Sequence, residues 1–203
     1  MRRALIGCLF IAMTGPAVTA EIESAHTELD IGKDCAAFAT PAADESADWA
    51  SYVCPGWRGY PVLVFYGDLR ESIFYGFPPE GDPARDWESF AAFNRTGTTI
   101  EWRILVDGER RSPIATIHRW FVSADEGEDE DIEVLVVEKV GQVQERQGCV
   151  MGYVVATGNE NANEKARRIA DEQAFDFACG ADQPVIDAGT VPLPAPSGGD
   201  NGG

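Results

Sequence analysis

The N-terminal segment constrains the fold most, because it decides in which compartment the chain folds. Residues 1–20 start with Arg2 and Arg3, continue with an apolar run from Ala4 to Met13, and end on the small residues Val18-Thr19-Ala20. This order of a positive start, an apolar stretch and small residues is typical of a secretory signal peptide. The apolar run is shorter than the roughly twenty residues that a membrane-spanning helix needs. We therefore expect cleavage after Ala20 and a periplasmic or secreted bacterial protein.

A lipoprotein signal is the alternative interpretation of this segment. Leu5-Ile6-Gly7-Cys8 has the local form of a lipobox, in which the cysteine is lipidated after cleavage. Most of the apolar residues follow Cys8, so cleavage there would precede the hydrophobic stretch of the signal. The order of the residues therefore favours the general secretory signal.

Export makes disulfides the expected state of the four later cysteines, Cys35, Cys54, Cys149 and Cys179. Four cysteines permit three pairings, and the spacing favours Cys35 with Cys54 and Cys149 with Cys179. Each bridge would close a loop of about twenty to thirty residues, worth on the order of 3 kcal/mol in the chain-entropy model. A metal site is the alternative, but the chain has no CxxC spacing and its histidines are far apart. We expect no metal, no cofactor and no free thiol in the mature protein.

The chain is strongly acidic, with 16 basic and 34 acidic residues and a formal net charge of −18. The signal holds two arginines and no acidic residue, so the mature chain has 14 basic and 34 acidic residues and a net charge of −20. Such a surface repels phosphate backbones and anionic lipid headgroups. We expect no nucleic-acid binding, no membrane insertion after cleavage, and a monomer whose partner is an unknown protein or small ligand of the envelope.

The mature chain has the length of one domain, which we place at residues 21–182. Residues 183–203 are rich in Pro, Gly, Ser and Asp and lack apolar periodicity, which is typical of a disordered tail. Within the domain, apolar and alternating runs predict strands over 60–66, 69–77, 100–106, 114–122, 132–140 and 149–156. Gly67-Asp68 predicts a type II′ hairpin turn, and Asp107-Gly108 begins a second turn.

Two helices are expected beside these strands. Asp82-Pro83 suits the start of a short helix that runs through Trp87, Phe90 and Ala91 and stops near Gly97. A longer helix follows the last strand, with one apolar stripe formed by Ala162, Ala166, Ile169, Ala170, Ala174 and Phe177. Because strands come first and no βαβ alternation occurs, we expect an α+β fold. It should have a mainly antiparallel sheet of about six to seven strands, a short middle helix, and the C-terminal helix packed on one face.

His118 is the first candidate for catalysis. It lies in a predicted strand, and the neighbouring hairpin strand is expected to bring Glu101 near it, which would begin a general-base arrangement. The motifs GxSxG, SxxK and HExxH are absent, so the sequence marks no nucleophile. A polar or half-buried strand histidine is the favoured interpretation of His118, and His26 is a weaker candidate because it lies in a polar segment. We assign no catalytic residue.

The segment Cys54-Pro-Gly-Trp-Arg-Gly-Tyr60 is the candidate recognition loop. Trp57, Arg58 and Tyr60 belong to residue types that are enriched at binding hot spots. The expected Cys35–Cys54 bridge would hold the loop rigid. The alternative is structural, with glycines that turn the chain and aromatic rings that pack on the core.

Two further motifs are weaker. The acidic run from Asp125 to Asp131 suggests calcium, because hard cations prefer several carboxylate oxygens, but its order does not match an EF-hand. A solvated loop is the favoured interpretation. Asn94-Arg95-Thr96 is a formal glycosylation sequon, which matters only in a eukaryotic secretory pathway.

The pattern of motifs along the chain resembles a group of small exported bacterial proteins of unknown function. It comprises the signal, Cys54 followed by GYPV, Phe93-Asn94 before Gly97, Thr99-Ile-Glu-Trp-Arg103, and Asn161-Ala-Asn163 before an AR..AD helix that ends at Cys179. The resemblance covers about residues 27–179. It implies a periplasmic location and carries no activity or site residues.

These observations favour a non-catalytic envelope protein that binds a protein or a small ligand. The alternative is a periplasmic enzyme of hydrolase type with a site around His118 and Glu101. An enzyme should bring such groups together in a cleft, whereas the binding hypothesis expects an exposed cluster around Trp57 and Tyr60.

Overall fold

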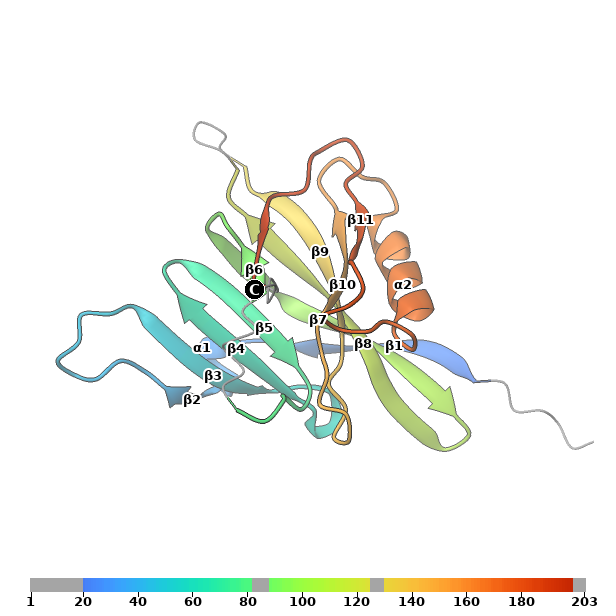
Figure 1. The fold of residues 1–203 in the computed structure, drawn as a ribbon, viewed down its shortest axis with the longest axis horizontal. Coiled ribbons are helices and arrows are strands. Elements are labelled where there is room, and N and C mark those ends of the chain that lie inside the picture. Colours follow the sequence, from blue (N-terminus) through green and yellow to red (C-terminus); the bar gives the residue numbers. More distant parts are fainter. Residues whose placement is uncertain (1–19, 82–87, 125–129, 199–203) are drawn as a thin grey trace, which may run out of the picture.

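The structure, a computed structural model, describes residues 20–81, 88–124 and 130–198 (Figure 1). The predicted signal peptide lies outside the described residues except for Ala20. None of the helices in these three ranges is long and apolar enough to cross a bilayer. The first strand, β1, begins at Glu21, which is the residue that the predicted cleavage would leave at the N-terminus.

The fold is α+β, and most of it is antiparallel sheet. The large sheet has the strand order β1 (Glu21–Glu28), β7 (Asn94–Asp107), β8 (Arg110–Val122), β9 (Ile132–Lys139), β10 (Val150–Val155) and β11 (Val185–Asp187). The small sheet has the order β2 (Ala36–Ala39), β3 (Trp49–Pro55), β4 (Pro61–Gly67) and β5 (Arg70–Tyr75). The remaining described elements are α1 (Ile31–Asp34), the 3₁₀ turn η1 (Trp57–Gly59), α2 (Ala162–Gln173), and the paired strands β6 (Ser89–Phe90) and β12 (Pro196–Ser197).

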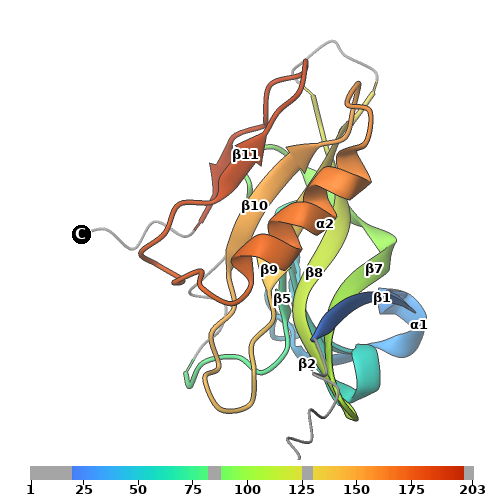
Figure 2. The same cartoon turned by 90° about the vertical axis from the view of Figure 1, so that its right-hand side faces the viewer.

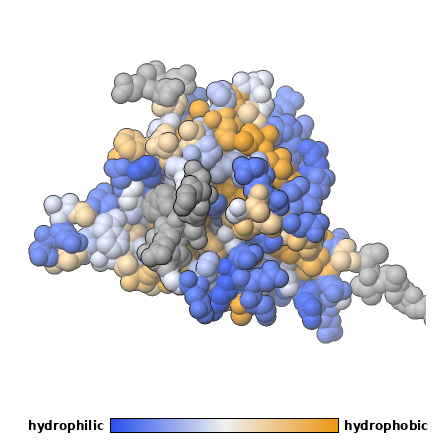
Figure 3. Space-filling view, in the orientation of Figure 1, coloured by the Kyte–Doolittle hydropathy of each residue, from blue (hydrophilic) through white to orange (hydrophobic). Residues whose placement is uncertain are grey.

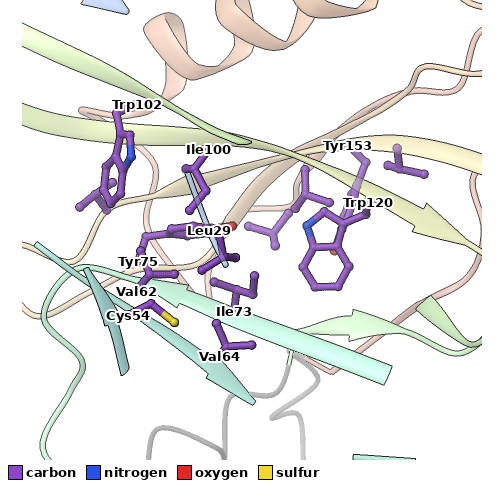
Figure 4. Packing of buried hydrophobic residues seen from close by; sticks show 14 of the residues in the cluster. Leu29, Cys54, Val62, Val64, Ile73, Tyr75, Ile100, Trp102, Trp120 and Tyr153 are labelled. Carbon is purple, nitrogen blue, oxygen red and sulfur yellow. The ribbon is translucent and has the colours of Figure 1, made fainter. Parts of the chain in front are cut away.

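The elements form three layers, with the large sheet between the small sheet and α2 (Figures 1 and 2). The space between the two sheets holds the main core, which contains large buried side chains such as Trp102, Trp120 and Tyr75 (Figure 4). Burial of a large apolar side chain contributes roughly 1.5–3 kcal/mol. The opposite face of the large sheet packs on α2, and the predicted apolar stripe from Ala162 to Phe177 is buried there. The C-terminal helix is therefore confirmed on one face of the sheet.

The long β7–β8 hairpin and the strands β9 and β10 agree with the predicted runs. The first hairpin was placed one residue too early, because Gly67 pairs with Arg70 and the loop consists of Asp68 and Leu69. Both loop residues have positive φ, 53° and 58°, which is the requirement of a type I′ turn. The predicted type II′ turn at Gly67-Asp68 is therefore wrong.

The predicted middle helix is not found in the described part of its range, while residues 82–87 lie outside the described residues. Ser89 and Phe90 form β6, and Asn94 already begins β7. Phe90 is buried, with its ring 5.7 Å from that of Trp120 and 5.8 Å from that of Tyr153. Packing against these rings holds the segment in an extended form, although its local sequence suits a helix.

The prediction of a disordered tail is wrong for the described part of residues 183–203. Val185–Asp187 form β11, which pairs in parallel with β10, and Pro196–Ser197 form β12, which pairs with β6. The backbone groups of these short strands are satisfied by strands that are distant in sequence. Composition averaged over twenty residues does not detect such strands, because their stability comes from pairing and not from their own side chains.

Both expected disulfides are present. Cys35 is bonded to Cys54 and Cys149 to Cys179. The first bond ties the segment after α1 to β3. The second fixes the chain after α2 to the start of β10, which brings residues 177–186 alongside the large sheet.

Candidate functional site

His118 and Glu101 lie on opposite faces of the large sheet. His118 is opposite Ile100 in the β7–β8 ladder, and Glu101 is opposite Ile117. Since neighbouring residues of a strand point to opposite faces, His118 points toward the small sheet and Glu101 toward α2. The arrangement in which Glu101 assists His118 is therefore not formed.

His118 is a buried structural residue and not a half-buried one. Its Nε2 is 2.7 Å from the carbonyl oxygen of Gly97, and its Nδ1 is 2.6 Å from the hydroxyl of Tyr75. A carbonyl oxygen only accepts, so Nε2 carries the proton and Nδ1 accepts the hydroxyl hydrogen of Tyr75. Burial lowers the pKa of His118 to about 4, so the ring is neutral at pH 7. Both nitrogens are already hydrogen-bonded, which leaves neither to act as a base on a substrate.

Glu101 instead belongs to a charge cluster that joins β7 to α2. Its carboxylate accepts hydrogen bonds from Arg167 at 2.7 and 3.1 Å. Two residues along β7, Arg103 donates to both oxygens of Asp171 at 2.8 and 2.7 Å. Ser24 donates to Glu101 at 2.5 Å and accepts from Arg103. We call Glu101, Arg103, Arg167 and Asp171 the helix clamp.

The charges of the helix clamp are matched in sign and geometry. Burial raises the pKa of Glu101, but the hydrogen bonds from Arg167 and Ser24 outweigh it, so this pKa lies below its usual value. The hydrogen bond to Glu101 raises the pKa of Arg167. His26 is half-exposed at the edge of the cluster, 3.9 Å from Glu101. The motif TIEWR in β7 and the motif AR..AD in α2 thus form one structural contact. In this contact each charged side chain has a partner of opposite charge.

The candidate recognition loop lies against the core. Trp57 and Tyr60 are partly buried, and Tyr60 contacts the ring of Phe77 and donates a hydrogen bond to Gln142 at 2.9 Å. Arg58 is exposed, has a φ of 46°, and lies 4.9 Å above the ring of Trp57. The packing gives both aromatic residues a structural role, and recognition by this loop stays a prediction.

Two other sequence motifs have simple structural outcomes. Asn94 is buried, and its side chain bonds to the backbone of Glu71 and Ala92 and to Ser89, so the sequon is inaccessible in the folded chain. Most of the acidic run lies outside the described residues, and its last member, Asp131, pairs with Arg95 at 3.1 Å. Over residues 20–81, 88–124 and 130–198, His, Cys, Asp and Glu side chains form no group of three that suits a metal ion.

A pocket of about 460 Å³ lies beside β10. Its walls come from Glu88, from Val150 and Tyr153 of β10, and from residues within 177–186 and 196–198. We call it the C-terminal pocket, because the Cys149–Cys179 bridge, β11 and β12 shape most of its walls. Figure 3 shows hydrophobic side chains gathered over β11 and the strands beside it.

A small inner cavity of about 10 Å³ adjoins the C-terminal pocket. The two share Glu88, Val150 and Tyr153, and the inner cavity is also lined by Trp120 and Glu138. Its volume suits a single water-sized group. The pocket and the inner cavity therefore share part of their walls, and we call the side with Glu88, Glu138 and Trp120 the polar end.

The polar end contains groups that are poorly matched to each other. Burial raises the pKa of Glu138 well above its usual value, and the nearby charge of Glu88 adds to the effect. Glu88 accepts a hydrogen bond from the backbone of Val150 at 3.0 Å, and Val150 pairs with Glu138 across the sheet. The indole Nε1 of Trp120 is buried, and the described residues provide it with no hydrogen-bond partner.

Sequence reasoning missed this pocket, because its walls come from four separate segments. Glu88 was assigned to a helix, and the wall residues within 183–186 and 196–198 were assigned to a tail. One signal was available. Glu138 interrupts the apolar inner face of a strand that is otherwise largely buried, and a fully buried carboxyl is uncommon outside ion pairs and functional sites.

Comparisons with known proteins do not assign this site, since no family model, curated protein or solved structure matches the chain.

Proposed function

We propose that this chain is an exported, non-catalytic envelope protein that binds a small ligand in the C-terminal pocket. The observation that carries the proposal is the pocket itself, whose volume of about 460 Å³ falls in the range of small-molecule sites. Its combination of apolar walls with a few converging polar groups is typical of such sites. The Cys149–Cys179 bridge supports a preformed shape, because it ties one wall to β10.

Catalysis is less well supported than binding. The hydrolase hypothesis needed His118 and Glu101 in one site, and they lie on opposite faces of the sheet. Glu101 is engaged by two hydrogen bonds from Arg167, and His118 by Tyr75 and Gly97. We therefore keep binding as the proposed function.

Export is the second part of the proposal. The signal-like order of residues 1–20, the two disulfides and the start of β1 at Glu21 support it. When the full chain is produced in a bacterium, N-terminal sequencing of the protein from the periplasmic fraction should return Glu21 as the first residue. Recovery of the full chain in the cytoplasm with free thiols would contradict export.

The binding proposal is tested by a fragment screen observed through the protein's own amide NMR signals. Mature protein with both disulfides intact should bind fragments that shift the signals of Val150, Tyr153 and Phe177. Ile186→Asp, on the pocket wall, should abolish these shifts. Val185→Asp is the matched control, because Val185 is its exposed neighbour on β11 and does not line the pocket.

Two results would overturn the binding proposal. In one, no fragment shifts the pocket signals. In the other, the shifts cluster at Trp57 and Tyr60, which would move the binding site to the candidate recognition loop.

A further inference from the structure

We propose that the inner cavity receives one hydroxyl group of an uncharged, polyhydroxylated ligand of the sugar class, an inference that rests on the binding function proposed above. The ligand's ring would occupy the C-terminal pocket, and the single hydroxyl would reach the buried polar end.

The size of the inner cavity limits what can enter it. A volume of about 10 Å³ holds one water-sized group and no more. Hydroxyl, carbonyl and ammonium groups meet this limit, whereas a carboxylate or phosphate does not. The hydrogen-bonding partners and the charge of the walls decide among the three.

Trp120 is a wall residue of the inner cavity that lacks a hydrogen-bond partner among the described residues. Its Nε1 is a donor only, it is buried, and it lacks a partner among the residues that the structure describes. A buried donor without a partner costs roughly 1–3 kcal/mol, so a ligand atom that accepts this hydrogen bond gains affinity. An ammonium group has no lone pair to accept it, and its positive charge would face the positive edge of the indole.

Glu88 and Glu138 also line this cavity. A hydroxyl can accept from Trp120 and can also donate to or accept from a carboxyl group, whereas a carbonyl can only accept. The two acidic side chains and the net charge of −18 also disfavour an anionic ligand. A neutral hydroxyl is therefore the group that fits the size, the donor and the charge together.

The C-terminal pocket suits the rest of such a ligand. Val150, Phe177 and Ile186 provide apolar surface for the C–H face of a sugar ring. Asp182 and Gln183 lie on the same walls and supply hydrogen-bonding groups for the remaining hydroxyls.

The test is a set of binding titrations by saturation-transfer NMR with mature, oxidised protein. The probes are glucose, galactose, mannose and N-acetylglucosamine, with glucosamine and glucuronate as charged analogues of matched shape. We expect at least one neutral sugar to bind more tightly than both charged analogues. Maltotriose and glucose together distinguish the end of a longer glycan from a free sugar, because only a glycan site gains affinity from added rings.

Trp120→Phe should weaken the affinity for the neutral sugar about tenfold, because it removes the indole donor and keeps an aromatic ring. Trp102→Phe is the matched control, since Trp102 is equally buried in the same sheet but already donates to Thr27 at 2.8 Å. Figure 4 shows Trp102 and Trp120 at opposite ends of the core. The control variant should leave the affinity unchanged.

Three results would overturn the inference. Preferential binding of glucosamine or glucuronate would show that the pocket selects a charged group and not a neutral hydroxyl. Equal affinities in wild type and Trp120→Phe would place the sugar outside the inner cavity. Binding of no sugar at all would mean that the cavity holds water only. If fragments still shift the pocket signals in the last case, the binding function stands and only the sugar assignment fails.

Discussion

The two faces of the large sheet differ in how their buried polar groups are paired. Toward α2, Glu101 and Arg103 are buried, and each meets an opposite charge in two-point contact. Toward the small sheet, the buried Glu138 meets a second carboxyl, Glu88. Trp120 lies on that same inner face, and its indole nitrogen has no partner among the described residues.

The difference separates architecture from candidate function. A cluster in which every charge is matched holds two elements together and offers nothing to a ligand. A cluster with an unused donor and a raised carboxyl pKa costs stability in the free protein, and such clusters are found at functional sites. The same strands therefore carry a structural contact on one face and a candidate binding site on the other.

Breaking the helix clamp should have the largest effect. Arg103→Met leaves the buried Glu101 and the partly buried Asp171 with fewer partners, and loss of one partner of a buried ion pair costs about 3–5 kcal/mol. Urea unfolding followed by circular dichroism measures this loss. Arg168→Met, at an exposed position of α2, is the control and should change the free energy of unfolding by less than about 0.5 kcal/mol. Equal effects of the two variants would contradict the clamp.

His118 should make the protein sensitive to acid. Its pKa is lowered by burial from 6.5 to about 4, so between these values the unfolded chain binds a proton that the folded chain does not. Stability from this group is present above pH 6.5 and is lost as the pH falls toward 4, by about 3 kcal/mol in total. His118→Gln should flatten this part of the pH profile. A profile unchanged in the variant would show that other groups cause the acid dependence.

The contribution of Glu138 to stability should depend on pH in the opposite direction from that of His118. Because the pKa of this buried carboxyl is raised, the folded chain keeps a proton that the unfolded chain loses above pH 4.5, so stability falls as the pH rises past that value. Glu138→Met should raise the free energy of unfolding at pH 7 by about 1–3 kcal/mol, because it removes a poorly matched polar group. The gain should shrink at pH 4. A loss of stability at pH 7 would mean that Glu138 has a stabilising partner.

The smallest expected effect is the difference in stability between variants of the two buried tryptophans, Trp102 and Trp120. Trp102→Phe removes a satisfied hydrogen bond to Thr27, whereas Trp120→Phe removes a donor that has no described partner. With similar losses of packing, Trp102→Phe should cost about 1 kcal/mol more in the free energy of unfolding than Trp120→Phe. Denaturant titrations at one pH measure the difference. The reverse order would indicate that Trp120 is hydrogen-bonded in the free protein.

The sequence predicted the features that depend on neighbours along the chain. The apolar stripe of α2 and the β7–β8 hairpin follow from local periodicity, and the disulfides follow from short spacings. β11 and β12 were missed because their pairing partners are distant in sequence. β6 was assigned to a helix because its extended form depends on the packing of Phe90 against Trp120 and Tyr153.

The candidate site was harder to predict than the fold. The pairing of His118 with Glu101 failed on a single position of register, because a shift of one residue changes the face of the sheet. The C-terminal pocket needs Glu88, β10 and the chain after α2 in one place, and only the folded chain shows that they meet. Glu138 was visible in the sequence as an isolated acidic residue in an apolar run, and its meaning depended on knowing which face it occupies.

The indole proton of Trp120 tests the central claim most directly. Uniform ¹⁵N labelling of the mature protein resolves the indole N–H signals of the tryptophans, which can be assigned by Trp→Phe variants. On titration with the neutral sugar that binds, the Trp120 indole proton should move downfield as it becomes hydrogen-bonded, and the Trp102 signal should stay in place. A saturated sugar complex in which the Trp120 signal does not move would contradict a ligand group at the inner cavity.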